Sequence, residues 1–555
     1  MKRRHIEEVH LRSSRNVWLA VCGCLALTCS TTFAQTTKAE TTSGECRVKA
    51  YGAKGDGIAL DTAAINAAVQ DCHSHGGGNV VVEPGTYRTG TIRLLDNTTL
   101  KLEPGSRILG SENLADYPHL AQASEDRNTA LVVAEGVHNV AIVGEGTIDG
   151  NGDAFTDKGV PHYFPFFDAA QTRQGQALVA RMAEGREGPV AMHERPGLLV
   201  LVLRSDGVVL RDFHVVNSPN WSVKVACSSH ISVSGLDVRN SMLVPNADAL
   251  DVSASSNVTI TNSYLEAGDD ALVLGGPCAD GWCHQVMENV AVSNVILHSR
   301  SAAIRIGPAA RDVRNMTFDN VIIRDSNRGI NIQARGGEVV ENLLFSNVVM
   351  ETRLIDGPWW GAGEPVSMTV AKWAYPSWPD APAEASGRIR DVVFNNMVAK
   401  SQSPIVIYST VPGLIEDVKF RGLDLTMQAN ALQQILGGNL DLRPTTPIDL
   451  GLVRRDLSAI EAYGVRGLTF SGLQVQWAGT FSEFYRNALH AEDFDGLTID
   501  GFKGEGSAPN YAALSFLHGK NLSIRDAYAD AGILVDPKVM GVRKPGASLK
   551  PIAAR

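Results

Sequence analysis

The 555-residue sequence lacks an excess of basic charge, contains few aromatic residues and has no apolar run long enough to cross a membrane. Lys and Arg total 50 against 60 Asp and Glu, a formal net charge of −10, so no basic face is available for nucleic-acid phosphates or anionic lipid. With 44% hydrophobic and 20% charged residues, the composition excludes a disordered or collagen-like chain. No nucleotide-binding signature appears either. The sequence is that of a globular protein with a large core and a neutral or weakly charged partner.

The N-terminus has the pattern of a secretory signal. Five basic residues precede an apolar run from Val17 to Cys29, which is too short for a membrane anchor and is followed by small residues up to Ala34. We therefore expect residues 1–34 to be removed on export, which places the protein outside the cell or in the periplasm. The alternative is a lipoprotein anchored at one of the cysteines near the end of the run. Removal of five basic and two acidic residues changes the net charge from −10 to −13.

Few cysteines remain after this segment, and their number is odd: Cys46, Cys72, Cys227, Cys278 and Cys283. An oxidising compartment favours disulfides. We predict one disulfide between Cys46 and Cys72 and another between Cys278 and Cys283, with Cys227 as a buried thiol. Metal binding is the alternative for the second pair, but no further Cys or His pair has ligand spacing.

A short pattern recurs through the rest of the chain: Asn, Asp or Gly followed by three residues of mostly alternating apolar character. The copies begin at Asn139, Gly207, Asn257, Asn289, Asn315, Asn342, Asp391, Asp417, Gly467, Gly496 and Asn521. Most neighbouring copies lie about 23–32 residues apart, which is the length of one turn of a solenoid. No segment of this region has the periodicity of a long helix.

The repeat predicts an all-β fold, a single-stranded right-handed parallel β-helix. β-Branched residues supply short strands, and Asn and Gly supply the turns. A β-sandwich or a propeller is the alternative, but sandwiches favour hairpins and propellers need longer repeats. The open end of a β-helix needs a cap, and residues 61–71 have helical spacing after a possible N-cap at Asp61. We expect one catalytic domain over 35–555, with 45–90 forming the N-terminal cap and opening segment.

Aspartates gather at one point of the repeat. The segment Asn246-Ala-Asp248-Ala-Leu-Asp251 is followed, 21 positions after Asp248, by Asp269 and then Asp270. One rung of a β-helix separates these positions, so we expect the carboxylates to share one external face. Their mutual repulsion raises at least one pKa, as glycoside cleavage by an acid and a base requires. The alternatives are turn residues bonded to nearby backbone amides, and a calcium site.

These residues resemble the signature of glycoside hydrolase family 28, the polygalacturonase family of inverting β-helix hydrolases. The later segment from Gly438 to Pro444 and the rungs after it resemble bacterial members of the same family. The segment from Tyr51 to Tyr87 likewise resembles the opening segment of pectin-lyase-like β-helix enzymes. The resemblance implies that Asp269 is the general acid, while Asp248 and Asp270 hold and deprotonate the attacking water. Asn246 and Asp251 are then expected to contact the substrate.

The sequence departs from the family pattern on the next two rungs. The family continues with Gly-His-Gly and then Arg-Ile-Lys, where this chain has Ser299-Arg300-Ser301 and Asn331-Ile-Gln333. Asn331 and Gln333 can bind a sugar hydroxyl but cannot neutralise a carboxylate. Arg300 and Arg305 could instead contact an acidic sugar, or they could form salt bridges to the aspartates. His298 is a weak substitute for the family's histidine.

An insertion rich in aromatic residues begins at Trp359 and Trp360 and continues through Trp373, Tyr375 and Trp378. Aromatic faces stack on sugar rings, so we expect Trp359 and Trp360 to contact the substrate. The alternative is that these rings cover the flank of the β-helix as a small separate core.

The sequence therefore predicts a secreted glycoside hydrolase that acts on a polysaccharide, of pectic type, as a monomer and without a cofactor or a metal. One alternative is a polysaccharide lyase on the same fold, which would act on uronates and would typically need calcium. The other is a non-catalytic carbohydrate-binding β-helix protein such as an adhesin.

Overall fold

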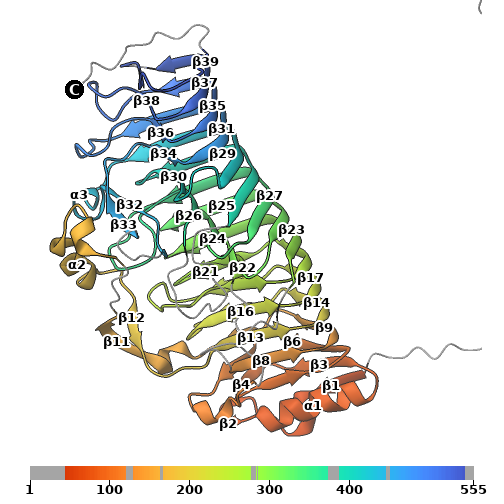
Figure 1. The fold of residues 1–555 in the computed structure, drawn as a ribbon. Helices are drawn as coiled ribbons and strands as arrows, with labels where there is room; N and C mark the ends of the chain where they lie inside the picture. The colour runs from red at the N-terminus through yellow and green to blue at the C-terminus, as the bar shows by residue number, and fades with distance from the viewer. Residues whose placement is uncertain are drawn as a thin grey trace, which may run out of the picture. The chain divides into compact units, whose positions relative to one another are not determined.

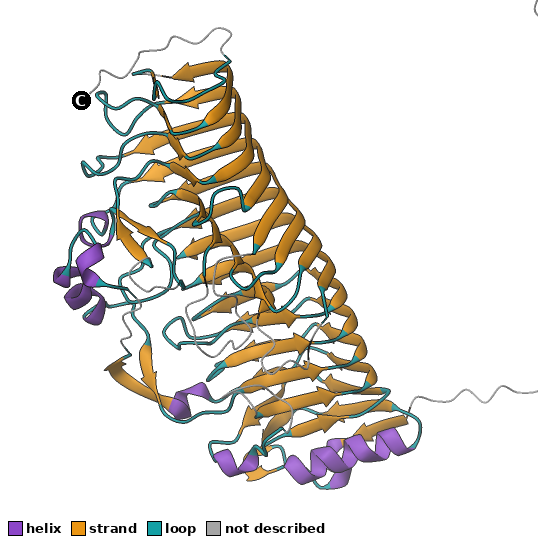
Figure 2. Ribbon diagram, in the orientation of Figure 1, coloured by secondary structure: helices purple, strands orange, loops and turns teal. Residues whose placement is uncertain are grey.

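The computed structural model describes residues 44–120, 129–162, 167–276, 283, 285–372, 387–445, 451–529 and 531–543. The predicted signal segment 1–34 lies outside these residues, as do Cys278, Trp373, Tyr375 and Trp378. Within them, short parallel strands stack rung upon rung into a β-helix (Figures 1 and 2). The predicted fold class is confirmed.

Each rung contributes to two parallel sheets that face each other across the core. Among the described residues the first sheet has 14 strands. In chain order these are β5 (Ile92–Leu94), β8 (Ala130–Glu135), β13 (Leu198–Leu203), β16 (Trp221–Ala226), β19 (Leu250–Ser253), β22 (Leu272–Gly276), β24 (Ala302–Ala309), β26 (Arg328–Ala334), β28 (Val366–Val370), β30 (Ile405–Ser409), β34 (Ile460–Tyr463), β36 (Leu489–Glu492), β38 (Leu514–Leu517) and β40 (Ile533–Val535).

The second sheet has 22 strands among the described residues. They are β1 (Gly44–Arg47), β2 (Asp56–Leu60), β3 (Gly78–Val82), β4 (Gly85–Thr89), β6 (Thr98–Leu102), β7 (Ser106–Gly110), β9 (His138–Val143), β10 (Thr147–Asp149), β14 (Asp206–Arg211), β15 (His214–Val216), β17 (Ser229–Ser234), β18 (Asp237–Arg239), β20 (Ser256–Thr261), β21 (Tyr264–Ala267), β23 (Met287–Ser299), β25 (Val313–Ser326), β27 (Val339–Thr352), β29 (Arg388–Ser401), β31 (Ile415–Gln428), β35 (Val465–Ala478), β37 (Asp495–Gly504) and β39 (Lys520–Ala529).

The recurring Asn, Asp or Gly at the head of each repeat adopts a left-handed backbone conformation. All eleven predicted positions have φ between 52° and 80°. Asn and Asp tolerate this region better than other residues with a side chain, and Gly adopts it freely. Several of these asparagines also form a ladder: Asn315 Nδ2 donates to Asn289 Oδ1 at 3.2 Å, and Asn342 Nδ2 donates to Asn315 Oδ1 at 2.8 Å. The head of each repeat is thus a left-handed residue near the start of a strand of the second sheet.

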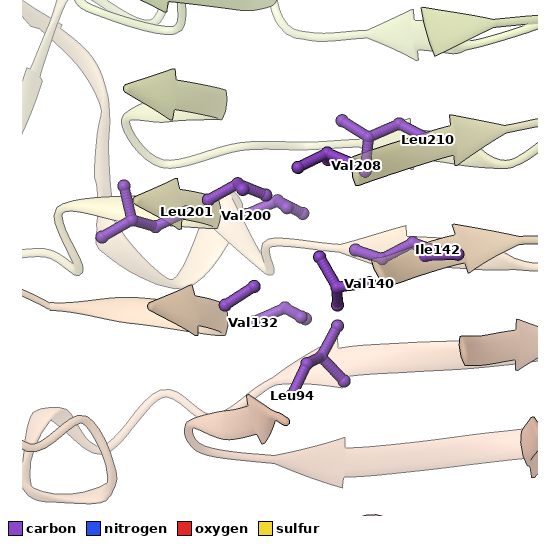
Figure 3. Close-up of a pocket in the computed structure, with 11 residues that line it drawn as sticks. Leu94, Val132, Val140, Ile142, Val200, Leu201, Val208 and Leu210 are labelled. Carbon is purple, nitrogen blue, oxygen red and sulfur yellow. The ribbon is translucent and has the colours of Figure 1, made fainter. Parts of the chain in front are cut away.

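The core between the sheets is filled by aliphatic side chains and by a column of stacked phenylalanines. Neighbouring rings in the column have centroids 4.4–5.1 Å apart. Its members are Phe318, Phe345, Phe394, Phe420 and Phe470. Figure 3 shows an apolar gap in the core of the earlier rungs, where Val132 and Val200 from the first sheet face Val140 and Val208 from the second. Because it is lined by aliphatic side chains of the core, this gap is a packing feature and not a site.

A helix covers the N-terminal end, as predicted (Figure 2). Helix α1 (Thr62–Ser74) buries Ile65, Ala68, Val69 and Cys72. Asp61 occupies the N-cap position, but its carboxylate accepts hydrogen bonds from the backbone of Lys54 and Gly55 at 2.7 and 3.0 Å instead of capping the helix.

Other short elements lie in loops that extend out from the rungs. Strand β11 (Thr156–Pro161) pairs antiparallel with β12 (Val190–Met192), and β32 (Asn439–Asp441) pairs antiparallel with β33 (Leu452–Arg454). The remaining helices are α2 (Gln176–Ala183), α3 (Gln433–Leu436) and the 3₁₀ helices η1 (Val48–Tyr51), η2 (Leu114–Asp116), η3 (Gly152–Phe155) and η4 (Ala169–Gln171). Figure 1 shows α2, α3, β32 and β33 beside the strands of the first sheet.

One of the two predicted disulfides is confirmed and the other is wrong. Cys46 in β1 is joined to Cys72 in α1, which fastens the cap to the first rung. Cys283 is joined to Cys227 and not to Cys278, so Cys227 is no free thiol. Cys227 follows β16 in a left-handed turn with φ of 52° and belongs to a small cluster that also contains Cys283. Their Cα atoms lie 5.7 Å apart, a distance that a disulfide spans and that tertiary folding alone produces.

Candidate active site

The predicted aspartates meet at the start of two adjacent strands of the first sheet. Strands β19 and β22 pair with Leu250 opposite Leu272, which places Asp248 and Asp270 at equivalent positions two residues earlier. The Ala249 amide donates to the Asp270 carbonyl at 3.0 Å. The two carboxylates are therefore one rung apart, about 4.8 Å along the stack.

Asp269 is held beside this pair by the turn of the preceding rung. The Asn246 amide donates to Asp269 Oδ2 at 3.3 Å, and Ser299 Oγ donates to the Asp269 carbonyl at 2.5 Å. Gly268 is needed because a Cβ there would lie 2.4 Å from the Val244 carbonyl oxygen. Its backbone is not left-handed, so this position requires glycine for close packing and not for a turn.

Two of the neighbouring carboxyl groups, those of Asp248 and Asp269, have raised pKa values. Burial, followed by the charges of Asp251, Asp269 and Asp270, raises the pKa of Asp248 well above its ordinary value. Burial and the charge of Asp270 raise the pKa of Asp269 to about 7. Asp248 is 3% exposed, and its Oδ1 has no hydrogen-bond partner among the described residues. At Asp248 and Asp269 the site therefore favours the protonated form of the carboxyl more than water does.

Asp270 is the carboxylate with a cationic partner. Arg305 Nη1 lies 3.0 Å from Asp270 Oδ2, and the Ala302 amide donates to Oδ1 at 2.9 Å. Burial opposes the charge on the guanidinium, but the surrounding carboxylates outweigh it and raise the pKa of Arg305. Of the two interpretations left open for Arg305, the salt bridge to the aspartates is present in the structure.

The remaining predicted polar residues follow one outward-facing column of the first sheet. Successive rungs place Lys224, Asp251, Val273, Arg305 and Asn331 opposite one another. Asp251 is 1% exposed and Asn331 is 3% exposed. The column thus carries charge and hydrogen-bonding groups past the aspartate cluster toward the C-terminal rungs.

A small pocket of about 10 Å³, room for about one water molecule, lies directly beside Asp270. Its lining residues are Asp270, Ser301, Arg305, Arg328, Asn331, Gln333, Trp360 and Pro444. Asn331 Oδ1 and Arg305 Nε are buried and have no hydrogen-bond partner among the described residues. Buried polar atoms of this kind are normally satisfied, so the pocket offers both an acceptor and a donor to a hydroxylated ligand.

Arg300 lies away from the aspartates. Its Nη2 is 3.3 Å from Glu187 and its Nη1 is 3.7 Å from Asp325, and both of these carboxylates also pair with Arg353. The salt bridge from Arg300 to the aspartate cluster, one of the two alternatives given from sequence, is not formed among the described residues, and the guanidinium pairs with Glu187 and Asp325 instead. The residue that lies beyond Asp270 on the next rung is Ala302, which pairs with Arg328 of β26.

The two tryptophans have different environments. Trp359 is 3% exposed and its Nε1 donates to the Glu187 carbonyl at 2.6 Å, so the expected sugar contact is wrong for this ring, which has almost no free face. Trp360 is half-buried and lines the pocket, as a sugar-contacting residue would. Of the two interpretations given from sequence, the buried core applies to Trp359, and the position of Trp360 is compatible with the sugar contact, which stays a prediction.

Several residues that the sequence did not single out belong to the site. Lys224 lies one rung before Asp251, and its Nζ is 4.9 Å from the centroid of the half-buried Trp221 ring. Arg328 and Pro444 line the pocket. Counting one rung back from Asp251 would have found Lys224, but no repeat spacing connects Pro444 with Asp270.

The described residues contain no group of three or more His, Cys, Asp and Glu side chains arranged to hold a metal ion. Within the same residues, no helix has the length and apolar character needed to span a bilayer.

Comparison with known families gives two matches along the chain. The family described as glycosyl hydrolases family 28 matches residues 174–433, and the family described as rhamnogalacturonase A/epimerase, pectate lyase-like, matches residues 46–151. An exo-poly-α-D-galacturonosidase of Dickeya chrysanthemi is 26% identical over 330 residues, 54% of this chain and 54% of its own length. A probable polygalacturonase of Vitis vinifera is 23% identical over 326 residues, 54% of this chain and 60% of its own length. The chain thus matches little more than half the length of these relatives.

Solved structures share the fold at low sequence identity. A family 28 exopolygalacturonase of Yersinia enterocolitica superposes with a TM-score of 0.59 at 18% identity, covering 82% of this chain and 78% of its own. An exopolygalacturonase of Thermotoga maritima gives a TM-score of 0.53 at 17% identity, covering 83% and 91%.

Proposed function

We propose that this chain, which belongs to glycoside hydrolase family 28, hydrolyses glycosidic bonds of a pectic polysaccharide by an inverting acid–base mechanism. The observation that carries the proposal is the contrast between two adjacent side chains. Asp269 has a pKa of about 7, whereas Asp270 is paired with Arg305 at 3.0 Å. A proton donor next to an ionised acceptor is the arrangement that glycoside hydrolysis needs.

In this mechanism Asp269 is the general acid. Its proton passes to the glycosidic oxygen as the bond to the anomeric carbon breaks, and the leaving sugar departs as an alcohol. Water attacks the anomeric carbon from the opposite face and gives its proton to Asp270. Asp248, whose pKa burial raises well above its ordinary value, donates a hydrogen bond from its protonated form and so orients the water. Proton exchange with solvent then restores both carboxyls.

The substrate is bound on both sides of the aspartates. Toward the C-terminal rungs, Arg305, Asn331, Gln333 and Trp360 supply a guanidinium, two amides and an aromatic face, which suit a hydroxylated or acidic sugar. On the other side, Asn246 and Asp251 are assigned to the substrate or the water. Arg300 is excluded from this set because Glu187 and Asp325 hold it elsewhere.

A pectic polymer is a plant cell-wall material outside the cell that degrades it, so we infer that the chain is exported through the segment 1–34 and works as a monomer. The names of the Dickeya and Vitis relatives are consistent with a galacturonan-type substrate.

Incubation with homogalacturonan, rhamnogalacturonan and neutral polysaccharides tests the proposal. We expect new reducing ends from at least one pectic polymer, with inverted anomeric configuration in the first turnovers as followed by proton NMR. A product with retained configuration would overturn the inverting mechanism. An unsaturated product that absorbs in the ultraviolet would replace hydrolysis by lyase action, and binding without any product would make the chain a non-catalytic module.

A further inference from the structure

The small pocket beside Asp270 is lined by side chains that are themselves buried. Asn331 is 3% exposed, Gln333 is 2% exposed and Arg328 is 1% exposed. Two buried polar atoms of the lining residues, Asn331 Oδ1 and Arg305 Nε, have no hydrogen-bond partner in the described part of the chain. Buried polar atoms without a partner destabilise the folded state, so both atoms call for a ligand that can pair with them.

The two atoms belong to neighbouring positions of the outward-facing column. Arg305 in β24 pairs with Asn331 in β26, so their side chains leave the sheet one rung apart, about 4.8 Å. No direct hydrogen bond joins Arg305 Nε to Asn331 Oδ1. Polar groups more than about 3.5 Å apart are commonly bridged by a water molecule.

The size and the charges of the pocket select water over other ligands. Its volume of about 10 Å³ admits about one water molecule and no sugar ring. A cation would be repelled by Arg305 and Arg328, and an anion would be repelled by Asp270. A water molecule is neutral, and it can accept a hydrogen bond from Arg305 Nε while it donates one to Asn331 Oδ1.

The walls of the pocket are held in place by buried ion pairs and hydrogen bonds. Arg328 lies 3.2 Å from both Glu364 and Asp441. Arg335 Nε donates to the Pro444 carbonyl at 3.0 Å. Because breaking buried ion pairs leaves uncompensated charges, the walls resist collapse onto the two polar atoms.

Arg305 connects the pocket with the aspartates. Its Nη1 lies 3.0 Å from Asp270 Oδ2, and the charges of Asp248, Asp251 and Asp269 act on the same guanidinium. Because the guanidinium is planar and rigid, a hydrogen bond at Nε also fixes the position of Nη1. The geometry of the ion pair with Asp270 therefore depends on the partner of Arg305 Nε.

We propose that the pocket holds one ordered water, which joins Arg305 Nε to Asn331 Oδ1 and makes Asn331 a positioning residue for Asp270. The catalytic part of this inference rests on the proposed function, in which Asp270 is the base. It refines that function, because Asn331 acts on Asp270 through the bridging water and Arg305 and not by contact with the sugar. The bridging water is distinct from the attacking water, which must lie within reach of Asp248 and Asp270.

A high-resolution crystal structure of the full-length protein tests the water site directly. We expect one water within about 3.2 Å of both Arg305 Nε and Asn331 Oδ1. The water should be lost in Asn331→Leu, whose side chain has a similar volume but no acceptor. A direct hydrogen bond between the two atoms, another group in the pocket, or no density there in the wild type would overturn the proposal.

Steady-state kinetics separate positioning from substrate binding. With a pectic oligosaccharide that the wild type cleaves, Asn331→Leu should lower kcat roughly tenfold while KM stays within about twofold. Ser367→Ala is the matched control, because Ser367 follows Asn331 in the column but does not line the pocket. Both constants of this control should stay within about twofold of the wild type.

An unchanged kcat in Asn331→Leu, with or without a rise in KM, would overturn the positioning role. Circular dichroism and thermal unfolding establish that both variants are folded. If the wild type cleaves no oligosaccharide, the proposed function fails and the positioning role fails with it. The water site is then still judged by the crystal structure, which does not depend on a substrate.

Discussion

Asp269 and Asp270 are neighbours in the chain, yet the fold gives their carboxyl groups different partners. The Asp270 carboxylate faces Arg305 and the amide of Ala302, both from the next rung. Burial together with the charge of Asp270 raises the pKa of Asp269 to about 7, and the charge of Arg305 only partly opposes this shift. The different environments of the two carboxyls are therefore created by β24 and not by the Asp-Asp pair itself.

The first prediction at this scale concerns pH. Because Asp269 must be protonated to act as the acid, kcat/KM should fall about tenfold per pH unit above about pH 7. Asp269→Asn should lose turnover by roughly 10²- to 10⁴-fold at all pH values and abolish this descending limb. The measurement is the pH profile of kcat/KM on an oligosaccharide. Asp424→Asn, at an exposed position of the second sheet, is the control and should match the wild type. A wild-type profile that stays flat to pH 9 would contradict the assignment.

A second prediction concerns the stability cost of the carboxyl cluster. The pKa of Asp248 is raised in the folded protein, so between its unfolded value of about 4 and its folded value the native state binds more protons than the unfolded chain. Stability from this group therefore decreases as pH rises through that window. Asp248→Asn removes the ionisation and should stabilise the protein by about 1 kcal/mol or more at pH 7, with little effect near pH 3.

Thermal unfolding of the wild type and Asp248→Asn at the two pH values measures the difference. A variant that is less stable than the wild type at pH 7 would show that the ionised carboxylate is satisfied by a partner, contrary to its orphaned Oδ1.

At the scale of elements, two positions define each rung: the left-handed residue at the head of the repeat and the apolar residue that enters the core. The left-handed residue at the head of each repeat sets where a strand begins, and three residues later an apolar side chain enters the core. From Asn315 onward that side chain is phenylalanine in five successive copies of the repeat, which gives the stacked column. Offset and stacked rings add to the stability that burial alone provides.

The column of stacked phenylalanines predicts that the loss of stability increases with the side-chain volume removed from it. Phe394 lies between Phe345 and Phe420 at 5.0 and 4.5 Å, so Phe394→Ala should cost about 3–5 kcal/mol through lost burial and a cavity. Phe394→Leu retains most of the volume and should cost clearly less. Val398→Ala, on the same strand but 43% exposed, is the matched control and should change stability by less than about 0.5 kcal/mol. Denaturant unfolding provides the comparison, and equal effects at positions 394 and 398 would contradict the role of the column.

At the scale of the whole molecule, the net negative charge is summed over the entire chain, whereas the candidate active site involves residues of only a few rungs. The net charge of −10 predicts repulsion from anionic surfaces, whereas the site concentrates its carboxylates around the single guanidinium of Arg305.

Export supplies the prediction at this scale. If residues 1–34 are a cleaved signal, the protein recovered outside the cytoplasm should begin at Gln35 and have a formal net charge of −13. N-terminal sequencing and intact mass measure this. A lipid-modified cysteine near the end of the apolar run would favour the lipoprotein alternative, and an intact Met1 would contradict cleavage.

Much of the fold could be predicted because it repeats. Spacing alone indicated the solenoid, the cap at 61–71 and the meeting of Asp248 with Asp269 and Asp270, since residues one rung apart become neighbours in space. The failures are long-range contacts made outside the repeat. Cys283 reaches back to Cys227, Arg300 turns to Glu187 instead of the aspartates, and Trp359 is buried against the same glutamate's carbonyl.

The sequence by itself determined the β-helix, the position of the turns and the rungs that carry the acids, because hydrophobic period, turn chemistry and rung length are local properties. Only the tertiary structure decided which carboxyl is paired and which tryptophan lines the pocket. Those depend on segments that leave the repeat and dock elsewhere, as the segment around Leu440 and Pro444 does over β28 and β30. Their docking is set by buried ion pairs and side-chain packing between residues more than 100 positions apart, as between Arg328 and Asp441, for which the chain carries no local signal.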